Sequence, residues 1–425
     1  MKVKFHQIMK KSRSIFNLIF IFSLAANIQA QSQKTFTKEI DVKKGVNIST
    51  NVPTDFYLSC DGTVTTDNTK DRFIISGKDG DQRLNISKEL NIYTWDKQVV
   101  KQEVMVNAHL ESNEAAKRFL TALDINFKEK ANDKLKIDAN MNFKSFEMNN
   151  GFFKSDECIV TLDDGSDHKV NRLEIQTTLY IPKDANLSVE GKRNCTIILD
   201  DLEGELELIL SYAEVYGKKA NRIKGNLNYC YNAIFDQVNH AEINAINSHV
   251  KINKVEKLEI GKEKISNRCL APSMKKLKRS NSFQNIFNIG TVETVEVYET
   301  ANDEINIDEV SFMNVAESAF SQFQIDQLNR ACDLKAKNSE VKIMKVHQDF
   351  NKINMTNELG EIYLRVDEGA NYRLNMPADN YLECDLDSKF IRVESKEGEE
   401  CYQVGKDEEQ SSIYINCDRC KFSII

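Results

Sequence analysis

The chain has 425 residues and a formal net charge of −8. An acidic chain is poorly suited to bind nucleic acid or anionic lipid, because both attract basic proteins. Its length exceeds what a single ordinary core supports, so two domains or a repeat array are expected.

The first 30 residues have the organisation of a secretory signal peptide. A basic segment from Lys2 to Arg13 precedes an apolar run over residues 15–26. That run is shorter than the roughly 20 residues that a membrane-spanning helix needs. We therefore expect cleavage between Ala30 and Gln31, with a retained anchor as the alternative. Cleavage would remove five positive charges and no negative one, which moves the formal charge from −8 to −13.

Residues 31–172 are predicted to form an N-terminal β region with one short helix. Apolar and polar residues alternate from Val104 to Leu110, which is typical of a half-buried strand. Between residues 112 and 124 the period changes, and Ser112 or Asn113 can cap a helix there. The apolar side chains of that amphipathic helix are Ala116, Phe119, Leu120 and Leu123.

Residues 173–375 contain a repeat that becomes clear after Pro182. Two apolar columns recur at one constant spacing: Ile289, Ile307, Ile325 and Ile343, and Val292, Val310, Leu328 and Val346. One copy consists of two alternating units around a polar corner and cannot bury its apolar face alone. Stacking copies about 4.8 Å apart builds one continuous core. The sequence therefore predicts an all-β protein with a parallel β-solenoid, or β-helix, of about 18 residues per rung.

Antiparallel meanders are the competing interpretation of the same alternation. The constant period lacks the Asn-Gly or Asp-Gly turns that are typical of hairpins, which favours the solenoid.

Residues 376–425 are predicted to form a Cys-rich β cap over one end of the solenoid. The Cys417-Asp-Arg-Cys420 pair stands alone, which makes it a weak zinc signal. One or two disulfides among Cys384, Cys401, Cys417 and Cys420 are one interpretation, and buried free thiols are the other.

Several segments occur in a characteristic order: residues 34–42, residues 92–97 with Trp95, the helix, and residues 180–187 before the repeats. In this order they resemble the adhesin-like exported β-solenoid proteins common in Bacteroidetes, a family of largely unknown function. The resemblance spans nearly the whole mature chain. It implies an extracytoplasmic β-helix without an assigned enzymatic activity, and it supplies no catalytic residues.

No catalytic, cofactor or metal site is predicted from the residues. His240 and His249 could approach each other across a rung, but a pair of histidines alone does not make a metal site. Asp308 and Asp326 share a column and could attract Ca²⁺. We favour the interpretation that they are solvated outward side chains, and Asp303 is interpreted in the same way. Asn288, Asn306 and Gln324 share a column in which stacked amides can stabilise the register.

The sequence therefore predicts a non-catalytic exported scaffold in the periplasm, at the outer membrane or at the cell surface. Its expected partner is a glycan or an envelope or surface protein, not nucleic acid, and no further membrane-spanning segment is expected. The alternative is a polysaccharide lyase or glycosidase, since β-helices host such enzymes and carboxylates do their chemistry. The only tryptophan, Trp95, lies outside the repeat, which weighs against sugar stacking along the rungs.

Overall fold

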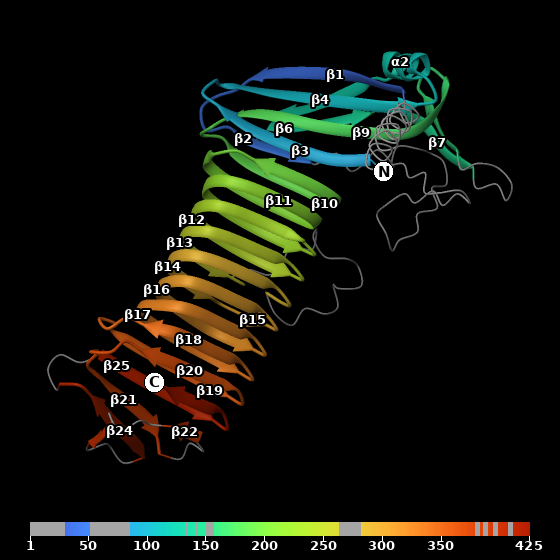
Figure 1. The fold of residues 1–425 in the computed structure, drawn as a ribbon. Helices are drawn as coiled ribbons and strands as arrows, with labels where there is room; N and C mark the ends of the chain where they lie inside the picture. The colour runs from blue at the N-terminus through green and yellow to red at the C-terminus, as the bar shows by residue number, and fades with distance from the viewer. Residues whose placement is uncertain are drawn as a thin grey trace, which may run out of the picture.

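The computed structural model describes residues 30–51, 86–131, 135–141, 143–149, 157–262, 282–378, 383–385, 390–393, 398–406 and 411–425. Within them the chain is all-β apart from one helix, and most strands join a long, open and mainly parallel sheet (Figure 1). The predicted all-β class is confirmed. Residues 1–29 of the predicted signal peptide lie outside the described residues, and Ala30 and Gln31 begin the first strand.

The N-terminal body, residues 30–182, lies at one end of the molecule (Figure 1). Its strands β1, β4, β9 and β3 lie side by side in that order, and only the β9–β3 pair is parallel. The predicted boundary between residues 172 and 173 falls inside β9, so the domain limits stay predictions. The elements are β1 (Ala30–Asp41), β2 (Asn47–Asn51), β3 (Ile86–Trp95), β4 (Val99–Leu110), α2 (Asn113–Ala122), β5 (Ile125–Ala131), β6 (Leu135–Met141), β7 (Phe143–Asn149), β8 (Glu157–Leu162) and β9 (Asp167–Pro182).

The predicted helix is observed as α2. Its apolar stripe, with Ala116 and Phe119 fully buried, packs in a second hydrophobic core together with β4 and β9. Ser112 takes an extended backbone conformation, and its hydroxyl accepts a hydrogen bond from the Ala115 amide at 3.1 Å. The cap satisfies an amide that has no partner inside the helix.

Loss of this cap gives a first testable result. Ser112→Ala is expected to lower the free energy of unfolding by about 1 kcal/mol, because the Ala115 amide loses its acceptor. Urea unfolding followed by circular dichroism measures the change. Ser112→Asp, which keeps an acceptor, is the control and should stay near wild type. Equal losses in the two variants would contradict the capping role.

The parallel stack, residues 186–425, extends from the N-terminal body. From β10 to β17 the long strands pair in parallel in chain order, and Figure 1 shows this succession. Its strands are β10 (Asn186–Leu199), β11 (Leu202–Asn228), β12 (Asn232–Ile246), β13 (His249–Ile260), β14 (Ile286–Val297), β15 (Thr300–Ala301), β16 (Glu304–Ala319), β17 (Gln322–Lys337), β18 (Glu340–Val346), β19 (Lys352–Glu358), β20 (Glu361–Val366), β21 (Tyr372–Pro377), β22 (Glu383–Asp385), β23 (Ile391–Val393), β24 (Glu399–Val404), β25 (Ser411–Asp418) and β26 (Lys421–Ile424).

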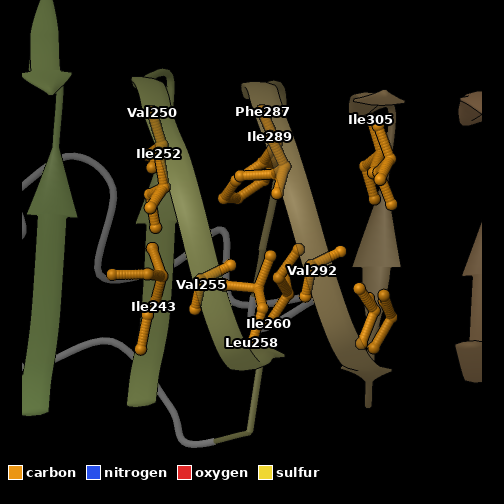
Figure 2. Packing of buried hydrophobic residues seen from close by; sticks show 14 of the residues in the cluster. Ile243, Val250, Ile252, Val255, Leu258, Ile260, Phe287, Ile289, Val292 and Ile305 are labelled. Carbon is orange, nitrogen blue, oxygen red and sulfur yellow. The ribbon is translucent and has the colours of Figure 1, made fainter. Parts of the chain in front are cut away.

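Both predicted apolar columns are buried and stacked. Ile289 pairs with Ile307, which pairs with Ile325 on the next strand, and all three side chains are at most 2% exposed. Val292 begins the second column, which continues through its register partners to Val346. Figure 2 shows the inward side chains of neighbouring strands lying side by side, with Ile252 next to Ile289. We call each level of this stack a rung.

One corner of the rungs uses residues in the left-handed backbone conformation. Gln284, Asn302, Phe320 and Asn338 have φ angles of 48–55° and follow each other at the same spacing as the apolar columns. Asparagine tolerates this conformation better than most residues, which explains how the corner forms with little glycine. The amide of Asn302 donates to the Ala319 carbonyl of the next rung at 3.0 Å, so the turn also links neighbouring rungs.

A buried polar ladder follows this corner, and it corrects the expectation for Asp303. Asp303 is 1% exposed rather than solvated. Its carboxylate accepts hydrogen bonds from the Asn285 amide at 2.8 Å and the Ser282 hydroxyl at 2.6 Å, and also from the Thr300 hydroxyl. In this ladder, a side chain of one rung accepts a hydrogen bond from a backbone amide of the rung before it. Ser321, for example, accepts from the Asp303 amide at 3.3 Å. Asp303 is therefore a structural residue of the interior.

The C-terminal residues complete the last rungs. β25 pairs with β19 and β26 pairs with β20, although β21 to β24 lie between the partners in the chain. The antiparallel pair of β21 and β24 lies beyond them. Cys417 and Cys420 form a disulfide, and Cys401 is a buried free thiol. The side chain of Cys384 lies outside the described residues.

Candidate functional site

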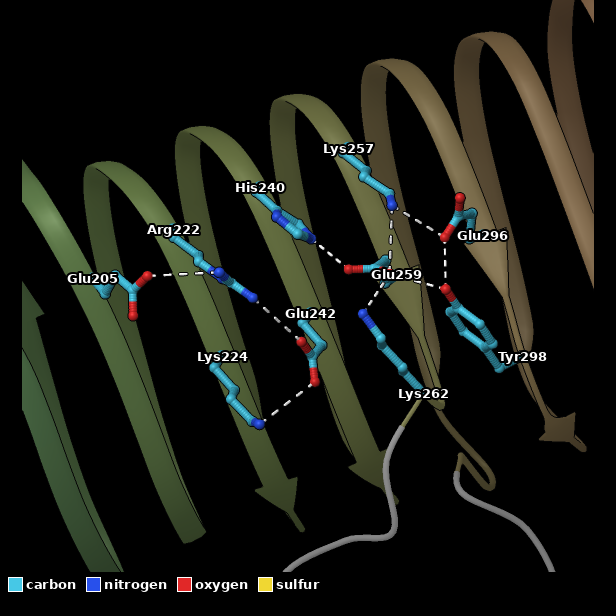
Figure 3. Close-up of polar contacts among 10 residues, drawn as sticks. All are labelled: Glu205, Arg222, Lys224, His240, Glu242, Lys257, Glu259, Lys262, Glu296 and Tyr298. Atoms are coloured by element: carbon cyan, nitrogen blue, oxygen red, sulfur yellow. Dashed lines mark hydrogen bonds and ion pairs between the residues drawn. The ribbon is translucent and has the colours of Figure 1, made fainter.

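The charged face is a group of ionisable side chains that covers four neighbouring strands, β11 to β14. Alternation directs these side chains outward, because their sequence neighbours Ile223, Ala241 and Leu258 fill the core. Figure 3 shows them in two linked groups, a Glu242 group with Glu205, Arg222 and Lys224 and a Glu259 network with the other residues. The group consists of Glu205, Arg222, Lys224, His240, Glu242, Lys257, Glu259, Lys262, Glu296 and Tyr298.

The charged face is built from two neighbouring columns, one of basic and one of mainly acidic side chains. Arg222, His240 and Lys257 are register partners on successive strands. Two residues further along, Lys224, Glu242, Glu259 and Glu296 are register partners and form the second column, which is acidic on β12 to β14. The glutamates one rung apart repel each other at about 5 Å, and the nearby Arg222, Lys224, Lys257 and Lys262 offset that repulsion.

Glu259 is the centre of the network and is 1% exposed. Its carboxylate accepts from the Lys262 ammonium at 2.9 Å and from the Tyr298 hydroxyl at 3.0 Å, and His240 Nε2 lies 2.5 Å away. Burial alone would raise the pKa of Glu259. The hydrogen bonds from Lys262, His240 and Tyr298, with the nearby Lys257 charge, outweigh burial and lower its pKa to about 2.

Glu242 is held more loosely than Glu259. It is 3% exposed, and its carboxylate oxygens lie 3.8 Å from Arg222 and 3.7 Å from Lys224. These distances make ion pairs but exceed the usual range of a hydrogen bond. Arg222 also lies 3.6 Å from Glu205, so its charge is shared between two carboxylates.

Glu242 and Glu259 are register partners, which places two carboxylates side by side as glycosidases do. Glycoside hydrolysis needs one carboxyl group that stays protonated near neutral pH, which requires a raised pKa. The pKa of Glu259 is lowered to about 2, and its oxygens are occupied by neighbouring donors. Glu259 is therefore not the protonated member of such a pair, and its contacts link neighbouring rungs.

The Glu259 network predicts a loss of stability in acid. Its folded pKa of about 2 lies below the ordinary value of 4.5, so its contribution is present above about pH 5 and is lost as pH falls toward 2. Glu259→Gln is expected to cost about 1–2 kcal/mol at about pH 7, a value reduced for the partly exposed lysines. The wild-type and variant unfolding free energies should converge as the pH falls to about 2. A difference that stays constant with pH would contradict this role.

His240 and His249, which could have approached each other across a rung, have different surroundings in the structure. His240 contacts Glu259, whereas His249 is exposed and lies in register with Ile286. Asp308 and Asp326 are exposed on neighbouring strands. Among the described residues, no three His, Cys, Asp or Glu side chains converge in a metal-binding arrangement.

The predicted amide column is partly linked by side-chain hydrogen bonds. The Asn306 amide nitrogen donates to Asn288 Oδ1 at 3.1 Å, across one rung. Gln324 is in register with Asn306. This column therefore joins neighbouring rungs, as the sequence predicts.

A second candidate site, the aromatic row of Tyr93, Trp95 and Tyr180, lies on the N-terminal body. Tyr93 and Tyr180 are cross-strand partners with ring centroids 5.6 Å apart, and Trp95 lies 5.3 Å from Tyr180. The row was not predicted from the sequence, because β4 to β8 lie between its two strands in the chain. The available signal was the Tyr-Thr-Trp and Leu-Tyr-Ile patterns, in which aromatic residues take the outward positions of predicted strands.

Neither a protein-family model nor a curated protein matches the chain. Among solved structures, it is similar to a protein from Clostridium sporogenes that bears the name "putative cell adhesion protein". That match covers 92% of this chain and 99% of the other, with 10% sequence identity and a TM-score of 0.15. No helix among the described residues has the length and apolar character needed to cross a membrane.

Proposed function

We propose that the chain is a non-catalytic, exported β-solenoid with rungs of about 18 residues that serves as an adhesin-like interaction scaffold of the cell envelope. The observation that carries this proposal is the set of outward polar side chains that are joined from rung to rung. Asn239 donates to Asn221 at 3.0 Å, and Asn253 donates to Asp236 at 3.0 Å. A surface that is already ordered loses little conformational freedom when it binds a partner.

Export is supported by the chemistry of the C-terminal end and by the N-terminal sequence. The Cys417–Cys420 disulfide is typical of an oxidising compartment outside the cytoplasm. The basic and apolar segments before Ala30 favour the same conclusion. The periplasm, the outer-membrane surface and the cell surface are the proposed locations, and a glycan or an envelope protein is the proposed partner.

The proposal is tested by binding and turnover measured on one preparation. The purified chain is applied to a glycan array and used in pull-downs from envelope extracts, and the bound glycans are then assayed for cleavage. Specific binding without turnover is the expected result. Release of unsaturated or reducing sugars would overturn the non-catalytic assignment and favour the lyase or glycosidase alternative. Absence of binding in both assays would contradict the scaffold role.

A further inference from the structure

The aromatic row lies where the N-terminal body meets the parallel stack, on strands β9 and β3 next to β10 (Figure 1). The neighbouring core residues Ile92 and Ile181 are at most 1% exposed, so alternation directs Tyr93, Trp95 and Tyr180 outward. Tyr93 is 44% exposed. The row is therefore a surface feature built on a rigid sheet.

The three rings are held in a fixed arrangement. The planes of Tyr93 and Tyr180 are inclined at 29°, and those of Trp95 and Tyr180 at 28°. The indole N–H of Trp95 donates to the Val99 carbonyl at 2.7 Å, which fixes the orientation of the ring. Rigid aromatic side chains provide contact area at a low cost in conformational entropy.

Both ends of the row carry charges that compensate one another. On the β4 side, Lys101 lies 5.4 Å from the Tyr180 ring and pairs with Glu103 at 2.6 Å. On the stack side, the Asp200 amide donates to the Ile92 carbonyl beside Tyr93, and Asp200 pairs with Lys218 at 2.9 Å. Each end therefore offers hydrogen-bond donors and acceptors together, and the Lys97 ammonium lies over the Trp95 ring at 4.9 Å.

We infer that the aromatic row binds a neutral carbohydrate. A sugar ring has an apolar C–H face that packs on aromatic rings and a rim of hydroxyl groups that both donate and accept hydrogen bonds. The row supplies the rings, and the Lys101–Glu103 and Lys218–Asp200 pairs supply partners for the hydroxyls. A polyanion would need a cluster of positive charges, whereas Lys97 is a single cation over the row, and a purely apolar ligand would leave the charged pairs desolvated. This inference rests on the scaffold proposal and names its partner class.

Cross-strand aromatic pairs also stabilise sheets, so the alternative is a purely structural role. A structural role requires folding to change when Tyr93 is removed, whereas a binding role requires the affinity for sugar to change. Because Tyr93 is 44% exposed, its truncation is expected to leave the fold intact. The two roles are therefore separable by experiment.

Trp95 is the only tryptophan of the chain, so tryptophan fluorescence reports on the row alone. The purified full-length chain is titrated with linear hexasaccharides of β-linked glucose, mannose and N-acetylglucosamine. A saturable change in emission with at least one of them is expected. Tyr93→Ala should weaken that binding by about tenfold or more, as truncation of a central aromatic contact does.

Tyr231→Ala is the matched control, since Tyr231 is 54% exposed elsewhere on the stack and should leave the affinity unchanged. No emission change with any hexasaccharide, or equal affinity in Tyr93→Ala, would overturn the aromatic row as a sugar site. Glycan binding on the array without a change in Trp95 emission would also overturn the aromatic row as the sugar site. The scaffold proposal would stand in that case. Turnover of the sugar would instead overturn the proposed non-catalytic function.

Discussion

Replacing Ile325 with alanine is expected to lower the free energy of unfolding by about 2–5 kcal/mol. Its side chain is fully buried and lies between Ile307 and Ile343, its register partners on the two adjacent strands. Truncation removes apolar contacts on both sides and leaves a cavity that the hydrogen-bonded strands cannot close by moving together. Because each rung contacts only its neighbours, the loss weakens two rung interfaces at once.

Urea unfolding measured by circular dichroism tests this expectation. The matched control is Asp326→Ala, the next residue in sequence, whose exposed side chain should contribute less than about 0.5 kcal/mol. A loss below about 1 kcal/mol for Ile325→Ala, or equal losses in the two variants, would show that this column is not the packed core.

The second large effect is expected at Asp303. Asp303→Ala should lower the free energy of unfolding by about 2–4 kcal/mol, because it removes the acceptor of several buried donors. The Asn285 amide and the Ser282 and Thr300 hydroxyls donate to this carboxylate, which is 1% exposed. Leaving a buried amide without an acceptor lowers stability more than losing a hydrogen bond that water can replace.

Asp303→Asn separates hydrogen bonding from charge at the same position. Asparagine keeps an oxygen for the Asn285 amide, and the Ser282 and Thr300 hydroxyls can rotate to accept from its nitrogen. We therefore expect Asp303→Asn to lose less than half as much stability as Asp303→Ala in the same urea measurement. An Asp303→Ala variant with wild-type stability would contradict the buried ladder, and equal losses in both variants would show that the charge itself is required.

The fold was largely predictable because its strongest determinant is a spacing. Ile289, Ile307 and Ile325 recur at one constant spacing, and such a column can be buried only when copies stack in register. The helix was predictable for a similar local reason, since Ser112 precedes a clear 3.6-residue pattern. Asp303 was predicted wrongly, because a polar residue at a corner has the same sequence pattern whether it faces solvent or the turn beneath it.

The candidate sites were harder to predict because they depend on pairings between distant segments. His240 and Glu259 meet only because β13 lies on β12 at a step that is slightly shorter than the main period. The aromatic row needs the parallel pairing of β3 with β9, and nothing in the local sequence of Tyr93 indicates that Tyr180 is its neighbour. Local periodicity determines which side chains point outward, whereas register determines which of them meet.

The parallel register of the stack is tested most directly by one distance. Lys251 and Lys342 share a column through Asn288, Asn306 and Gln324, so four rungs separate them. Spin labels attached at these two positions through non-cysteine chemistry should give a distance of about 19 Å by electron paramagnetic resonance, four strand spacings of about 4.8 Å. In antiparallel meanders with strands of about nine residues, twice as many strand spacings would separate the two labels. A distance of about 38 Å would therefore contradict the parallel stack.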